Sequence, residues 1–283
     1  MTALIWHTLK RLRWHIVGWS LGMAYMGSLI VIFANNLTSQ LALMQRLIDS
    51  LPPGMMKFFG GLEGFATPAG FIDGKLFSQL PLLLGIFAII VGAGLVVSDE
   101  ESGMMDVLLG RPISRTKLFW ARVLGVIGAA TIILVVGALS ATVPLLWIDI
   151  GISPEKMMLA FVPAWAQVLF FISLTLLLSM ILPSQKIAAS VAGVYLIFGF
   201  AVDGMANITA KLDTVALFSP LKYYQGGSIL LDEYLRWDWL GGILAFALLF
   251  AVLAWWRFLA RDLRVRGEGS WQMPANRRHH RSV

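Results

Sequence analysis

The sequence predicts an all-α integral membrane protein with six transmembrane helices. Its composition is 58% hydrophobic and 13% charged, whereas soluble globular domains carry about 25% charged residues. Six stretches of about 20 residues are almost free of ionisable side chains, and each is long enough to cross a hydrocarbon core of about 30 Å as a helix. The basic residues gather beside the ends of these stretches, as in membrane proteins.

The elements follow in order along one predicted transmembrane domain, residues 1–263. An interfacial amphipathic helix is expected over residues 1–16. Apolar side chains recur there at helical spacing, whereas His7 and the basic residues near position 10 are polar. The first span is expected to end at Asn35 and Asn36, a pair that favours turns. A polar, arginine-rich tail follows at residues 264–283, with the composition of a disordered segment. The predicted spans are residues 14–33, 77–97, 123–147, 158–182, 187–205 and 239–260.

An even number of spans places both termini on one side, and the basic residues indicate which side. The segments on the side of the termini hold Lys10, Arg11, Arg13, Arg111, Arg115, Lys117, Arg122, Lys186 and the seven arginines from Arg257 to Arg281. The other side holds Arg46, Lys57, Lys75, Lys156, Lys211, Lys222 and Arg236. Because positive residues favour the cytoplasm, the sequence predicts a multi-pass protein of the cell membrane with both termini cytoplasmic. The net charge of +6 therefore indicates membrane topology rather than nucleic-acid binding.

Several kinds of chemistry have no residues to support them. The chain has no cysteine, which excludes disulfides, thiolate metal sites and cysteine nucleophiles. No phosphate-binding loop occurs, since Gly74 and Lys75 are followed by leucine, and neither a zinc-protease nor a serine-elbow motif is present. We therefore expect no catalytic residue, cofactor or metal in this chain, and any energy from ATP has to come from another chain.

The most informative segment lies between the second and third spans, where residues 98–112 read as a short helix with both ends encoded. Ser98 and Glu101 form a capping-box pattern, and Asp99 and Glu100 suit the positive end of the helix dipole. Gly110 is suited to end the helix, and Pro112 prevents its continuation. A helix of about a dozen residues, some 18 Å long, is too short and too acidic to cross a membrane.

This helix has an apolar face formed by Met104, Val107 and Leu108, which requires burial. Lipid headgroups, the protein's own bundle and another protein are the alternatives. Its acidic residues disfavour an anionic membrane surface. Spacing alone favours packing on the bundle over docking to a partner. After it, Ser114 is positioned to cap the third span, with Arg115 as a positive anchor.

The run from Ser98 to Arg122 resembles the cytoplasmic loop of ABC transporter permeases of the type-2 export class. In that family the loop forms a coupling helix that docks into the nucleotide-binding subunit, and an elbow helix precedes the first span. Met104 stands where threonine is usual in the family and Arg122 where lysine is usual. The family's motif positions are occupied by Glu100, Glu101, Gly103, Leu108, Leu109, Pro112, Ser114 and Arg115. With the flanking and face residues, the predicted docking set is Ser98, Asp99, Glu100, Glu101, Gly103, Met104, Val107, Leu108, Leu109, Pro112, Ser114 and Arg115.

The resemblance extends more loosely along the whole chain, including Ser219-Pro220-Leu221 before the last span and Arg261-Asp262-Leu263 after it. It implies a permease subunit of an ATP-driven exporter, paired with a second permease, identical or related, and with an ABC ATPase that binds ATP and Mg. An ion-coupled secondary transporter is the alternative. That class would require ionisable residues inside the spans, and Asp203 is essentially the one candidate, better explained as an interfacial anchor.

Some polar and small residues inside the spans have structural explanations. Gln79 and Gln167, together with Pro81 and Pro163, are expected to bond between helices rather than to line a path. Three pairs have the spacing that permits close helix contact: Ala88 with Gly92, Gly137 with Ala141, and Ala189 with Gly193.

Overall fold

The computed structural model describes residues 1–37, 67–97, 114–206, 212–231 and 234–260. These residues are helical or irregular with no β-strand, and six of their helices are long and apolar enough to cross a membrane. The all-α class and the six spans are therefore confirmed. The elements are α1 Thr2–Arg11, α2 Arg13–Leu37, α5 Pro68–Ile72, the π-helix η2 Asp73–Phe77, α6 Leu80–Gly94, α9 Arg115–Thr142, the 3-10 helix η3 Val143–Leu146, α10 Pro154–Ile181, α11 Gln185–Ala206, α12 Asp213–Ala216, the 3-10 helices η5 Pro220–Tyr223 and η6 Ser228–Leu231, and α13 Trp237–Ala260.

Two spans begin earlier than their apolar stretches. The second starts at Pro68, because Thr67 caps it by accepting a hydrogen bond from the Gly70 N–H at 3.1 Å, and continues through η2 into α6. The third starts at Arg115, because Ser114 Oγ accepts a hydrogen bond from the Lys117 N–H at 3.3 Å. The first turns of both helices contain polar side chains, which a capped helix end tolerates. The predicted starts, based on hydropathy, were therefore about eight residues too late.

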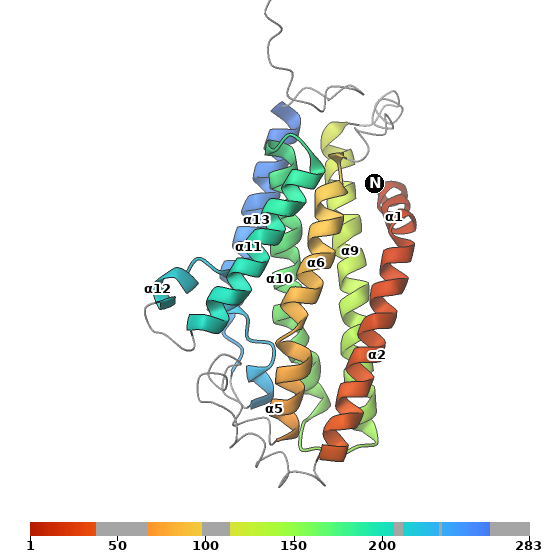
Figure 1. Cartoon of the computed structure of the whole chain (residues 1–283). Helices are drawn as coiled ribbons and strands as arrows, with labels where there is room; N and C mark the ends of the chain where they lie inside the picture. Colours follow the sequence, from red (N-terminus) through yellow and green to blue (C-terminus); the bar gives the residue numbers. More distant parts are fainter. Residues whose placement is uncertain (38–66, 98–113, 207–211, 232–233, 261–283) are drawn as a thin grey trace, which may run out of the picture.

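The bundle divides into two groups of helices that pack mainly within themselves (Figure 1). α9 packs along α2 and α1, while α10 lies in the centre and packs against α6, α11 and α13. α6 and α9 contact each other little, and the two groups are joined by α10 and α13 against α9 and by α5 and η2 against α2. α10 is the most buried of the six spanning helices and α2 the least.

Glycines lie at close helix contacts in both groups. A Cβ at Gly92 of α6 would lie 2.9 Å from the Ile172 carbonyl oxygen of α10, and a Cβ at Gly137 of α9 would lie 2.8 Å from the Met23 Cε of α2. These two predicted pairs therefore lie at helix contacts. The third does not, because a Cβ at Gly193 of α11 would meet nothing within 4 Å.

The start of α1, the end of α6, the start of α9 and the end of α13 lie together at one end of the bundle, here called the α1 end (Figure 1). The start of α13 and the end of α2 lie toward the opposite end. α1 packs against α9, with Thr8 buried near Gly125. Whether α1 lies on a membrane surface, as an elbow helix would, stays a prediction.

Candidate functional site

The predicted docking segment begins and ends at the α1 end of the bundle. Its residues Ser98 to Pro112 lie outside the described residues, so the capped acidic helix and its apolar face stay predictions. Of the predicted docking residues, Ser114 and Arg115 are described, both at the start of α9. The geometry of the site is therefore that of the two ends that hold the segment.

The chain enters this segment from a packed position. Leu95, Val96 and Val97, directly after α6, are 5%, 2% and 0% exposed and belong to the hydrophobic core. Apolar side chains buried to this degree resist displacement, since exposing each would cost about 1.5–3 kcal/mol. The chain is therefore firmly packed up to Val97.

The chain leaves the segment into an equally firm anchor. Phe119 of α9 stacks on Phe258 of α13 with ring centroids 5.6 Å apart, and both side chains are fully buried. Close by, the Trp255 indole N–H donates to the Thr116 hydroxyl at 3.4 Å. Aromatic pairs and this hydrogen bond fix the first turns of α9 to the end of α13. The start of α9 is thus held by α13, a helix of the same group as α6, although α9 packs mainly along α2 and α1.

The two ends of the bundle differ in charge among the described residues. The α1 end carries basic side chains and no acidic one in the part of the chain that the structure describes; its basic residues are Lys10, Arg11, Arg13, Arg115, Lys117, Arg122, Lys186 and Arg257. The opposite half holds Lys75, Lys156, Lys222 and Arg236 with Asp73, Asp149, Glu155, Asp203, Asp213 and Asp238. A basic α1 end suits acidic partners such as the helix predicted over residues 98–109.

A cavity of about 180 Å³ opens at the α1 end between α1, α6, α9 and the start of α11. Its polar lining includes Arg11, His15, Arg122 and Gln185. Arg122 is 4% exposed and its Nη1 donates to the Thr8 hydroxyl at 3.5 Å. Arg122 was predicted as a motif residue of a loop, and its burial under α1 was missed, because nothing in the local sequence shows that α1 packs on α9.

One polar residue inside the spans, Gln167, bonds between elements as expected, and the role of Gln79 stays a prediction. The Gln167 side-chain amide donates to the Pro220 carbonyl and so ties α10 to η5. Pro163 stands inside α10 without ending it. Asp203 lies half-buried on α11, three residues before the end of that helix. No group of three or more histidine, aspartate or glutamate side chains suited to a metal occurs among the described residues.

A buried phenol lies near the opposite end. Burial of Tyr224, and then the nearby Asp73 carboxylate, raise the pKa of its hydroxyl well above the ordinary value. The hydroxyl therefore stays neutral at physiological pH. Within the described residues the hydroxyl has no hydrogen-bond partner, and the side chain packs against the hydrophobic core.

Six apolar helices define a membrane-embedded protein, and the comparison with known families names its kind. The sequence model described as ABC-2 family transporter protein matches residues 21–263. The chain belongs to this family and is an ABC transporter permease, a multi-pass membrane transport subunit. A comparison with curated proteins finds no significant match.

Proposed function

We propose that this chain is the permease subunit of an ATP-driven exporter, and that a separate ABC ATPase docks on the helix predicted over residues 98–109. The observation that carries the proposal is the family match, supported by the firm packing of the chain on both sides of this segment, at residues 95–97 and at Phe119. The ATPase binds ATP and Mg, since the chain has no phosphate-binding loop. The α1 end, with its excess of basic residues, faces the cytoplasm.

The packing supplies a mechanism for coupling. α9, about 42 Å long at the helical rise, is packed along α2, and α6 is packed along α10. Because α6 and α9 contact each other little, movement of the segment that joins them would shift one group against the other, with the contacts of α9 to α10 and α13 as the joint. Helix groups that slide or rock as units are a common form of conformational change. ATP-driven closure of two ATPase subunits would thus alternate access through the permeases.

A second permease, identical or related, completes the assembly. Large apolar side chains on α11 point away from the bundle, with Val194 at 67%, Ile197 at 64% and Phe198 at 57% exposed. α2 is likewise the least buried span. Such faces contact either lipid or another subunit, as the proposed dimer requires.

The docking proposal is tested by charge reversal at the predicted helix. The permease is co-expressed with the ATPase encoded nearby, and Glu101→Lys is combined with Leu108→Asp. We expect the ATPase to be lost from the purified complex and transport-coupled ATP hydrolysis to fall by at least about tenfold, since buried interface charges and anchors dominate affinity.

The matched control is Glu155→Lys, which reverses an exposed carboxylate at the opposite end of the bundle. It should co-purify with the ATPase like the unmodified chain. Unchanged co-purification and coupled hydrolysis in the double variant would refute docking at this segment.

A further inference from the structure

A groove lies between α11 and α13 toward the end of the bundle opposite α1. Its volume is about 500 Å³, within the range of ligand sites in proteins. α11 and α13 each pack against α10 but are not packed against each other, so Phe170 of α10 forms the floor. Most of the lining is aromatic: Phe170, Tyr195, Phe218, Tyr223, Trp239, Phe246 and Phe250.

The groove opens sideways, toward the surface that faces lipid in a membrane-spanning bundle. Phe218 is 78% exposed and Phe246 is 54% exposed, and both line it. Deeper in, the Phe170 and Phe250 rings lie 5.5 Å apart and close its inner end. An occupant can therefore enter from the bilayer without passing through the bundle.

The length of the groove corresponds to one leaflet. On α13 its lining runs from Asp238 to Phe250, a distance of about 18 Å at the helical rise. Half of a hydrocarbon core of about 30 Å is about 15 Å. The groove thus extends from the start of the last span to about the middle of the membrane.

Along this length the polar groups of the wall are already used. The Tyr195 hydroxyl donates to the Phe218 carbonyl at 2.7 Å, and the Tyr223 hydroxyl donates to the Leu217 carbonyl at 3.1 Å. Both bonds hold the segment before η5 over the groove. A polar molecule would lose its hydration here without new hydrogen bonds from these hydroxyls, whereas a hydrocarbon chain would fit.

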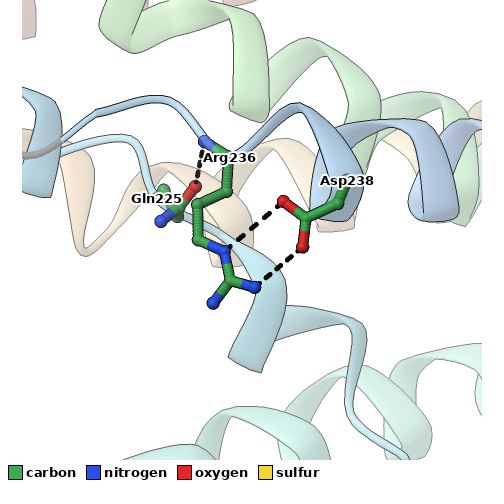
Figure 2. Close-up of polar contacts among 3 residues, drawn as sticks. All are labelled: Gln225, Arg236 and Asp238. Carbon is green, nitrogen blue, oxygen red and sulfur yellow. Dashed lines mark hydrogen bonds and ion pairs between the residues drawn. The ribbon is translucent and has the colours of Figure 1, made fainter.

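The charged groups stand at one end of the groove. Figure 2 shows the Arg236 guanidinium paired with the Asp238 carboxylate through two contacts, Nη2 to Oδ2 at 2.7 Å and Nε to Oδ1 at 3.4 Å. The backbone N–H of Arg236 also donates a hydrogen bond to the Gln225 side-chain oxygen at 2.9 Å. The guanidinium lies 3.9 Å from the centre of the Trp239 ring. The pair stays accessible, with side chains 49% and 62% exposed.

This end presents one positive and one negative group at the level of the first turn of α13. A zwitterionic headgroup is complementary to it, with its phosphate beside Arg236 and its ammonium beside Asp238. Tryptophan and tyrosine at this level are typical of the headgroup interface. An anionic headgroup would place its phosphate near Asp238 without a compensating ammonium.

We propose that the α11–α13 groove is a binding site for a zwitterionic phospholipid of the adjacent leaflet, with one acyl chain on the aromatic floor and the headgroup at Arg236 and Asp238. This binding requires neither the ATPase nor transport, so it stands or falls separately from the exporter proposal.

The test uses two neighbouring glycines of α13. A Cβ at either Gly241 or Gly242 would meet nothing within 4 Å, but Gly242 lines the groove and Gly241 does not. Gly242→Leu therefore places a side chain into the groove without a backbone clash, and Gly241→Leu is its matched control. The full chain is reconstituted in vesicles containing a phosphatidylethanolamine with a photoactivatable group in one acyl chain.

For the unmodified protein we expect labelling within residues 239–250, mapped by mass spectrometry. Gly242→Leu should reduce this labelling by about tenfold, because the side chain excludes the acyl chain, whereas Gly241→Leu should leave it unchanged. Equal labelling of the two variants, or no labelling within residues 239–250 of the unmodified protein, would overturn the proposal. Mapping in the unmodified protein decides the matter even if Gly242→Leu fails to fold.

Headgroup selectivity is tested separately with Arg236→Gln combined with Asp238→Asn. In the unmodified protein, labelling by phosphatidylethanolamine should exceed labelling by phosphatidylglycerol several-fold, about fivefold for two exposed charge contacts. The double variant should bring the ratio close to one. Equal labelling by both lipids in the unmodified protein would contradict the headgroup assignment.

Discussion

The contact between α6 and α10 and the groove between α11 and α13 are built from the same kinds of residues with opposite results. In the first, Gly92 lies so close to the Ile172 carbonyl that a methyl group has no room. In the second, Gly242 faces open space, and Phe170 and Phe246 lie where a neighbouring helix would otherwise pack. Small and apolar residues therefore permit a close contact without requiring one.

This difference also separates two functions of the bundle. Close contacts join α6 with α10, and α2 with α9, and in the proposed mechanism each pair moves as a unit. An open groove gives up packing energy between protein helices, so an apolar surface remains for lipid. Single-residue variants at these contacts test the contrast.

The largest effect is expected at Gly92. Gly92→Ala should lower the free energy of unfolding by about 1–3 kcal/mol. The added Cβ would lie 2.9 Å from a backbone oxygen, and this clash can be relieved only by moving α6 or α10. Denaturant titration of the detergent-solubilised protein measures it. Gly241→Ala, at an open position, is the control and should raise the free energy of unfolding by about 0.5–1 kcal/mol. Equal stabilities would show that the α6–α10 contact yields easily.

A smaller effect is expected at the wall of the groove. Tyr195→Phe removes the donor to the Phe218 carbonyl and keeps the ring, so stability should fall by about 1 kcal/mol. Labelling by the photoactivatable lipid should fall with it, because the segment before η5 is held less firmly. If labelling rises instead, this hydrogen bond restricts access to the groove rather than shaping it.

At the α2–α9 contact the expected change is slight. Gly137→Ala meets Met23 Cε at 2.8 Å, the flexible end of a methionine that can rotate away. We expect a loss of about 0.5 kcal/mol or less in the same titration. A loss as large as that of Gly92→Ala would mean that the Met23 side chain cannot move, and that α2 and α9 are locked as tightly as α6 and α10.

The smallest effect is expected at Asp203 on α11. Asp203→Asn should leave ATP-dependent transport unchanged in reconstituted vesicles, because an interfacial anchor needs no ionised carboxylate. Loss of transport in this variant, together with transport in the absence of any ATPase, would favour the ion-coupled alternative.

Much of the fold could be predicted from the sequence because it follows from local physics. A length of about 20 apolar residues is sufficient to predict a spanning helix, so all six were found. The cap at Ser114 was likewise predicted and is present. The start of α9 was nevertheless placed too late, since hydropathy does not show that Arg115 to Arg122 continue the same helix. The docking segment depends on motif and resemblance, and its structure stays a prediction.

By itself, the sequence determined the number of spans, the helical class and the family, because backbone groups in lipid must be satisfied within each helix and motif residues lie close along the chain. Only the tertiary structure decided that Arg122 is buried under Thr8, that Gly193 faces outward while Gly92 is pressed against α10, and that a groove separates α11 from α13. These features join residues up to 114 positions apart. They depend on which helix faces meet. The sequence does not show this, because apolar residues cover nearly all faces of a helix in a membrane.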